Sequence, residues 1–347
     1  MKITATNRKT WENFYQSAIA FRDLAPWQWM RDSDMFGVQD PATGEVGWCC
    51  IMGAAGVVYA LGVYPGLEGY KSYDMLVQAP YQDLTESDEL ALGMEQNILK
   101  TEFVDRNETD KTDRAVFKKL GLKFRGHNQW VQAREMSPGY LPYYMTDEQA
   151  AFMAHCFQQA VIVAERFKED MGILRDDSDR MLVRTATGEN GALAWKDEYR
   201  PEPEWDEPPM QPANTFLVNR AKKELERKKA AICFSLDYMP NPVEGPNRTR
   251  PYFPKIALWM VYGSGMIIGF ELFSPKNIKE RFENVFFEKL HQIGIIPQQL
   301  IVNSNMAYDA VEPIAQALEM ELIFAPDEEV FREVREGMMG RFMGGGF

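Results

Sequence analysis

An acidic, proline-rich segment near the middle of the chain limits what this sequence can fold into. Residues 197–213, DEYRPEPEWDEPPMQPA, hold five prolines and six acidic residues in seventeen positions. Proline lacks a backbone N–H and fixes φ, and like charges repel, so this segment favours an extended chain. The chain has 347 residues, which is enough for two cores. We therefore predict an N-terminal domain at 1–196, a linker at 197–213 and a C-terminal domain at 214–347.

The net charge of −13 belongs almost entirely to the N-terminal part. Residues 214–347 hold 16 Lys and Arg against 17 Asp and Glu, whereas residues 1–213 hold 22 against 34. An acidic surface repels phosphate backbones. Broad nucleic-acid binding by the N-terminal part is therefore not expected, and nucleic acid is a possible partner through the C-terminal domain only.

The cysteine and histidine patterns argue against a zinc site. The four cysteines include no CxxC pair, and the chain has only three histidines. The N-terminus MKITATNRKTWENFYQ has no apolar core, which argues against a signal peptide. The apolar stretch 256–273 is split by Gly263-Ser264-Gly265 into two runs of strand length, which predicts a hairpin. We expect reduced cysteines, a cytoplasmic protein and no membrane partner.

The N-terminal domain has the pattern of an α+β fold with a small antiparallel sheet and one long core helix. The sequence predicts a helix at 10–24, strands within 35–64, polar helices within 83–120 and an extended stretch at 122–135. The long helix begins at TDEQAAFMAHCF, where Thr146 is the expected N-cap and Gln149 stands at the capping-box position. Apolar residues then recur at helical spacing, so this helix should be buried.

The C-terminal domain has a sharper order of elements. Three strands come first, two of them in the 256–273 hairpin, and helices then alternate with strands. The expected elements are strands at 230–239, 254–262 and 265–273, a helix at 275–294, a strand at 298–303, a helix at 306–320, a strand at 321–326 and a helix at 327–339. Pro313 within the second helix predicts a kink, or a break near residue 310.

This order of elements over roughly residues 230–337 resembles the α/β ribonuclease H-like fold. In that fold three antiparallel strands come first, and two parallel strands are added through helical crossovers. The whole chain, including GYLPYY and MFGVQDPATGE, is similar to uncharacterised bacterial proteins that are known as domains of unknown function. The resemblance implies a two-part layout and names no activity.

The resemblance also implies where a nuclease of this fold would carry its acids. One lies in the first strand, a second at the end of the fourth strand and a third on the last or first helix, because two Mg²⁺ ions need charged oxygen ligands. By position, Asp237 corresponds to the first acid and is the candidate metal ligand. Asn303 stands at the second position, where an amide brings no charge. Asp327 and Glu328 open the last helix.

Each of these residues also has a structural explanation. Asp237 can accept backbone bonds before the turn that follows its strand. Asn303 and Asp327 precede helices and are good helix-capping residues. A candidate nucleic-acid surface is formed by Arg248, Arg250 and Lys255 beside Tyr252, because single-strand binders place cations next to aromatic rings.

From these patterns we expect a non-catalytic binding or regulatory protein with a degenerate ribonuclease H-like domain, no cofactor and a protein partner. One alternative is a Mg- or Mn-dependent nuclease that acts through Asp237 and carboxylates of the last helix. Another is a small-molecule sensor with an apolar pocket between the domains. The position of Asp237 relative to Asn303, Asp327 and Glu328 discriminates between the first two.

Overall fold

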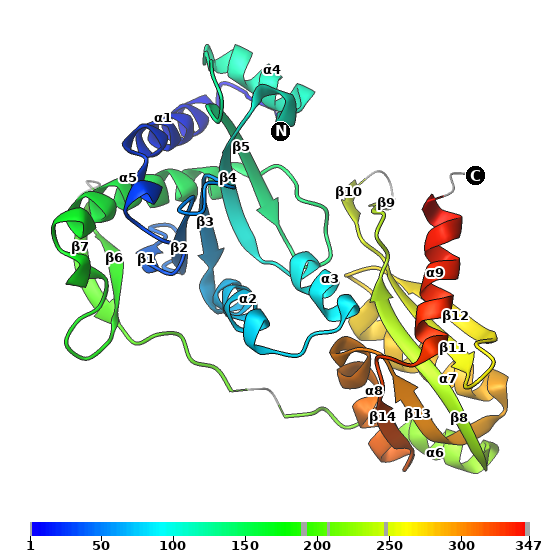
Figure 1. Ribbon diagram of the computed structural model, residues 1–347. Coiled ribbons are helices and arrows are strands. Elements are labelled where there is room, and N and C mark those ends of the chain that lie inside the picture. The colour runs from blue at the N-terminus through cyan, green and yellow to red at the C-terminus, as the bar shows by residue number, and fades with distance from the viewer. Residues whose placement is uncertain (1, 189–192, 207–208, 246–248, 344–347) are drawn as a thin grey trace. The chain divides into compact units, whose positions relative to one another are not determined.

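The chain, drawn in Figure 1, forms two units that divide between Trp205 and Asp206, within the predicted linker, but two earlier segments also belong to the second unit. A computed structural model describes residues 2–188, 193–206, 209–245 and 249–343. The first unit comprises Met1–Val77, Gln96–Ser137 and Pro142–Trp205; the second comprises Gln78–Glu95, Pro138–Leu141 and Asp206–Phe347. Two segments expected in the N-terminal domain thus belong to the second unit, because their hydrogen bonds are made there. Leu141 N–H, for example, donates to the carbonyl of Pro251 at 3.0 Å.

Seven strands among the described residues form one sheet in the first unit. They are β1 Phe36–Gln39, β2 Val46–Met52, β3 Ala60–Pro65, β4 Ile98–Val104, β5 Trp130–Met136, β6 Met181–Thr187 and β7 Ala194–Arg200. Their order is β5-β4-β3-β2-β1-β6-β7, and all neighbours are antiparallel except β1 and β6. The sheet is therefore larger than the small antiparallel sheet expected. One of its strands, β4, lies within the stretch assigned to polar helices.

Strand β7 also corrects the start of the linker, since residues 197–200 are paired with β6. The acidic side chains of this strand are neutralised by cations. Asp197 pairs with Arg166 at 2.6 Å and with Arg184. The backbone hydrogen bonds to β6 and the ion pairs of Asp197 thus outweigh the local preference of these residues for a solvated linker.

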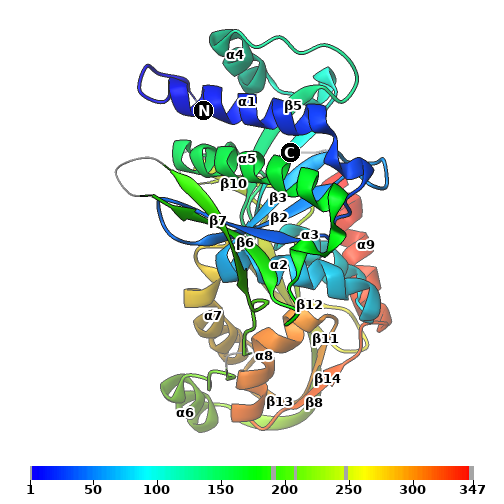
Figure 2. The ribbon, with the colours of Figure 1, turned by 90° about the vertical axis from the view of Figure 1, so that its left-hand side faces the viewer.

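Helices cover both faces of the seven-stranded sheet. They are α1 Arg8–Leu24, α2 Gly66–Gln78, α4 Lys111–Leu120 and α5 Asp147–Glu169, with 3-10 turns η1 Pro26–Gln28, η3 Arg106–Glu108 and η4 Met171–Leu174. Figure 2 shows α1 and α5 side by side, and both contribute to the core on one face. Helix α2 packs on the other face through Tyr70. The predicted capping box of Thr146 and Gln149 is confirmed at the start of α5.

The second unit contains a sheet of five described strands and a separate two-stranded ribbon. The strands are β8 Glu226–Tyr238, β9 Val243–Gly245, β10 Thr249–Tyr252, β11 Lys255–Val261, β12 Ile267–Phe273, β13 Ile295–Val302 and β14 Glu321–Phe324. The sheet order is β12-β11-β8-β13-β14. The pairs β8–β11 and β11–β12 are antiparallel, whereas β13 is parallel to both β8 and β14. The predicted hairpin at 256–273 is therefore formed by β11 and β12.

Helices of the second unit lie on both faces of the five-stranded sheet. They are α3 Glu86–Met94, α6 Thr215–Glu224, α7 Ile278–Ile293, α8 Asn305–Ala317 and α9 Glu329–Met343, with the 3-10 turn η2 Ala79–Tyr81. Helices α6, α7 and α8 share a core on one face, and α9 packs on the other face through Val330 and Phe331. Gly294 ends α7 with a φ of 81°, the left-handed conformation that glycine adopts without a steric penalty.

Helix α8 contradicts one of the two outcomes expected from Pro313, the break near residue 310. The helix runs without interruption from Asn305 to Ala317. Its buried residues Val311 and Ile314 lie on both sides of the proline. Burial of this face offsets the missing proline N–H. Among the described residues, no helix combines the length and the apolar character needed to cross a membrane.

Candidate functional site

The strand alternation of the second unit brings two predicted site residues together. On β8, Ile232, Phe234 and Leu236 point into the core beneath α7 and α8, so Asp237 points to the opposite face. Asn303 comes directly after β13. Because Val302 points into the core beneath α7 and α8, Asn303 lies on the same face of the sheet as Asp237, and it is 2% exposed. Its Nδ2 donates to Oδ1 of Asp237 at 3.3 Å. The first-strand acid and the fourth-strand amide are therefore neighbours.

The third side chain at this position comes from α3, a helix far away in the sequence. Ser87 donates from its hydroxyl to the same Oδ1 of Asp237. Arg335 of α9 donates to Oγ of Ser87 at 2.9 Å and pairs with Glu86 at 2.5 Å. The last helix thus contributes a guanidinium near Asp237.

Helix α3 is also tied to the start of α8. The carboxylate of Asp88 accepts from the backbone N–H of Asn305 at 3.0 Å and from its Nδ2 at 3.1 Å. An acid at a helix N-terminus satisfies unpaired N–H groups and complements the helix dipole. Thr85 and Asp88 in turn form a capping box that starts α3.

The sequence interpretation did not identify Ser87, Asp88 or Arg335. The Thr85–Asp88 spacing is a capping signal, and it predicts where a helix begins. It carries no information about which strand the helix will contact. Only the tertiary structure brings Ser87 to Asp237 and Arg335 to Ser87.

Neither of the two acids predicted at the start of the last helix is a described hydrogen-bond partner of Asp237 or lines the pocket beside it. Asp327 is exposed. Glu328 accepts from the hydroxyl of Tyr262 at 3.4 Å. Burial, with the nearby Glu328 carboxylate, raises the pKa of Cys233 to about 12. Within the described part of the chain, no three His, Cys, Asp or Glu side chains gather closely enough to hold a metal ion.

A pocket of about 160 Å³ lies beside Asp237 and Asn303. Its walls are mainly apolar and come from α3, β11 and α9: Leu90, Ile256, Leu258, Met260, Phe331 and Val334. The buried Oδ1 of Asn303 has no hydrogen-bond partner among the described residues. An unsatisfied buried acceptor costs about 1–3 kcal/mol of stability.

The residues proposed to contact nucleic acid hold segments of the second unit together. The Arg250 guanidinium lies over the ring of Tyr140 at 5.1 Å, and its Nε donates to the carbonyl of Leu141 at 3.1 Å. Lys255 pairs with Glu95 at 2.7 Å. Tyr252 forms a β-bridge with Tyr140. Arg248 lies outside the described residues.

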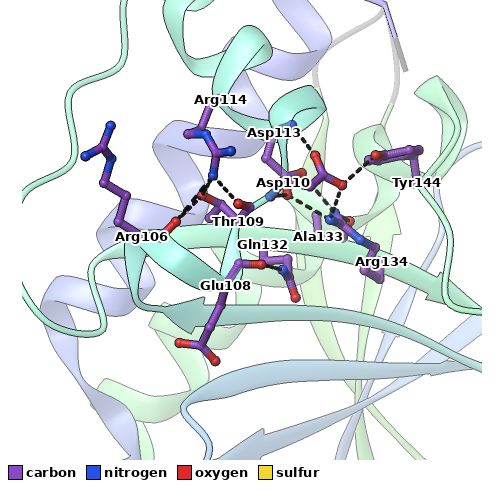
Figure 3. Close-up of polar contacts among 10 residues, drawn as sticks. All are labelled: Arg106, Glu108, Thr109, Asp110, Asp113, Arg114, Gln132, Ala133, Arg134 and Tyr144. Atoms are coloured by element: carbon purple, nitrogen blue, oxygen red, sulfur yellow. Dashed lines mark hydrogen bonds and ion pairs between the residues drawn. The ribbon is translucent and has the colours of Figure 1, made fainter.

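A second cluster of acidic side chains lies in the first unit, between α4 and β5 (Figure 3). Arg134 binds Asp113 through two hydrogen bonds, of 2.9 and 2.7 Å, and reaches Asp110 at 3.1 Å. The hydroxyl of Tyr144 donates to Asp110 at 2.5 Å. The side chain of Asp113 is only 2% exposed. A buried carboxylate needs a partner of this kind.

The same cluster forms the N-terminus of α4, and its electrostatics follow from its contacts. The backbone N–H of Asp113 donates to Asp110 at 2.9 Å, and that of Asp110 donates to Asp113 at 3.1 Å. Burial raises the pKa of Asp110, but the bonds from Tyr144 and from the Asp113 N–H, with the charge of Arg134, hold that pKa below its ordinary value. We read this cluster as a stabilising network, because its carboxylates have partners within the unit.

Comparisons with known proteins give a family and no activity. A family model described as "Domain of unknown function (DUF7309)" matches residues 11–184, which are 174 of the 347 residues. A second model, described as "Domain of unknown function (DUF6930)", matches residues 217–339. No curated protein and no solved structure matches the chain. Because the first match covers half of its length, the chain belongs to the DUF7309 family.

Proposed function

We propose that the protein is a non-catalytic binding protein whose second unit is a ribonuclease H-like domain without a two-metal site. The strand order β12-β11-β8-β13-β14 supports this fold, because three antiparallel strands are followed by two parallel strands. Helices α7 and α8 are the connections expected before the fourth and fifth strands.

One observation carries the functional part of the proposal. Asp237 is surrounded by an amide, a hydroxyl and, through Ser87, the guanidinium of Arg335. Two Mg²⁺ ions need several charged oxygen ligands, whereas the side-chain partners of Asp237 among the described residues are an amide and a hydroxyl, and the nearby Glu86 is already paired with Arg335. These residues do not fit a two-metal centre, whereas the adjacent apolar pocket fits a bound organic group.

The alternative is the Mg- or Mn-dependent nuclease that acts through Asp237. The position of Asp237 at the end of β8, next to Asn303, favours it. The positions of the two carboxylates expected from the last helix argue against a nuclease. Glu328 contacts Tyr262, and Asp327 is exposed. We also propose a protein partner, as expected from the sequence.

Titration of Mn²⁺ into the purified protein by calorimetry separates the two functions. For a non-catalytic binding protein we expect no saturable heat at about millimolar Mn²⁺, and no difference between the wild type and Asp237→Ala. Asp327→Asn is the matched control, since it removes an exposed carboxylate of the same unit. Saturable binding of Mn²⁺ that is lost in Asp237→Ala and kept in Asp327→Asn would support the nuclease instead of the non-catalytic function.

A further inference from the structure

We propose that the pocket beside Asp237 binds a small organic cation with an apolar body and one protonated amine. The amine would donate hydrogen bonds to the Asp237 carboxylate, and the body would lie against the walls from α3, β11 and α9. This inference rests on the proposed function, because it assigns a ligand class to the same site.

The Asp237 carboxylate is a hydrogen-bond acceptor at the pocket, so a ligand there should carry a hydrogen-bond donor. Nδ2 of Asn303 points at the Asp237 carboxylate, and this fixes the orientation of the amide, since the reverse would set two acceptors against each other. Oδ1 of Asn303 is therefore the atom without a partner among the described residues, but it is shielded from solvent. Both described side-chain contacts to Asp237 use its Oδ1, so its Oδ2 is the acceptor that the pocket offers.

The charge of the pocket favours a cation over an anion. Its charged lining residues are Glu86, Asp237 and Arg335, which sum to −1. Arg335 is paired with Glu86 and donates to Ser87, so its charge is already compensated. The Asp237 carboxylate has hydrogen-bond donors but no ion pair among the described contacts. A carboxylate or phosphate ligand would be repelled there, whereas an ammonium group would supply the missing positive charge.

The size of the pocket limits the body of the ligand. A cavity near 150 Å³ with apolar walls holds a single six-membered ring. The pocket, at about 160 Å³, is of this size. The amine would therefore be attached to one ring or to a short branched chain. Larger cations, such as polyamines with several charges, would leave unpaired charges against Leu258 and Phe331.

The test compares three probes of one shape by ligand-observed NMR on the full chain. Benzylamine carries the cation, benzyl alcohol is its neutral counterpart, and benzoate is the anion. We expect benzylamine to bind at about millimolar concentration, as fragments of this size do. Benzyl alcohol should bind at least about tenfold more weakly, and benzoate should not bind.

Two variants assign the binding to this pocket. Asp237→Asn should weaken the binding of benzylamine at least about tenfold, because the negative charge is lost while the shape of the side chain is kept. Leu90→Trp should also abolish binding, since it fills the pocket without changing its charge, and Leu90 is exposed enough to be replaced. Asp327→Asn should leave binding unchanged. Near-UV circular dichroism checks that each variant is folded.

Several results would overturn the inference. Equal binding of benzyl alcohol and benzylamine, unchanged binding in Asp237→Asn, or no binding of benzylamine to the wild type would each do so. These failures differ from failure of the proposed function, which would appear as Mn²⁺ binding that depends on Asp237. The amine inference can therefore fail while the non-catalytic function stands.

Discussion

The acidic clusters of the two units differ in how completely their carboxylates are paired. In the first unit, Asp113 is buried and has a two-bond partner in Arg134, while Asp110 accepts from Tyr144 and from a helix N-terminus. In the second unit, the donors that the described residues offer to Asp237 are uncharged, and within the same residues the buried Oδ1 of Asn303 has no partner.

This difference separates a structural role from a binding role. A buried charge that is fully paired within its own unit stabilises the fold and leaves little to bind a ligand. An incompletely paired group beside an apolar pocket costs stability unless a ligand satisfies it. Burial of an acid is thus a poor indicator of function, whereas its unmet hydrogen-bonding capacity is informative.

The largest expected effect tests the paired cluster. Arg134→Met should lower the free energy of unfolding of the first unit by about 3–5 kcal/mol, because it leaves Asp113 charged and unpaired in the interior. Urea unfolding followed by tryptophan fluorescence reports on this unit, since seven of the eight tryptophans, all in described residues, belong to it.

A second substitution provides the control for that loss. Adding Asp113→Asn to Arg134→Met removes the unpaired charge and should restore part of the stability. If the single and the double variant are equally unstable, the loss comes from packing and the network is not electrostatic in origin.

A smaller effect is expected from making the Asp237 cluster of the second unit more acidic. Asn303→Asp places a carboxylate beside Asp237, and at pH 7 we expect a loss of about 1–3 kcal/mol. Because like charges raise the pKa of one acid of the pair, the loss should shrink as the pH falls toward about 5. Mn²⁺ should raise the melting temperature of this variant and not that of the wild type. Unchanged stability at pH 7 would show that Arg335 already compensates both charges.

Acidification should act on the first unit through its paired carboxylates. The Arg166 hydrogen bond, together with Arg184, lowers the pKa of Asp197, as Tyr144 and Arg134 lower that of Asp110. Their contribution to stability is present above the unfolded pKa of about 4 and is lost as the pH falls through the lower folded values. Urea midpoints between about pH 7 and pH 3 should therefore fall mainly below pH 4, and Asp197→Asn should flatten this decline. A decline that begins near pH 6 would point to other groups.

The smallest effect is expected at the predicted acid that makes no contact with the pocket. Asp327→Asn should change the free energy of unfolding by less than about 0.5 kcal/mol, because its side chain is exposed. Thermal unfolding of the second unit measures this change. A loss above about 1 kcal/mol would mean that the charge of Asp327 stabilises the start of α9.

The sequence predicted most elements of the second unit because their patterns are local. Apolar residues at helical spacing marked α7, and the run of β-formers around Gly263-Ser264-Gly265 marked the β11–β12 hairpin. Strand β4 was missed because its residues Ile98–Val104, ILKTEFV, do not alternate strictly between apolar and polar side chains, and they lie among segments with helical composition. Strand β7 was missed because its stability comes from pairing with β6 and from cations on other elements.

The sequence by itself determined the acidic residue at the end of β8, the amide after β13 and the lack of zinc-ligand spacing, because each follows from residue identity and strand phase. Only the tertiary structure decided what surrounds Asp237. Helix α3 and Arg335 lie about 150 residues before Asp237 and about 100 residues after it, and they reach it because chain folding brings distant segments together. Local patterns encode helices and strands through short-range periodicity, whereas contacts between distant elements depend on how their faces pack.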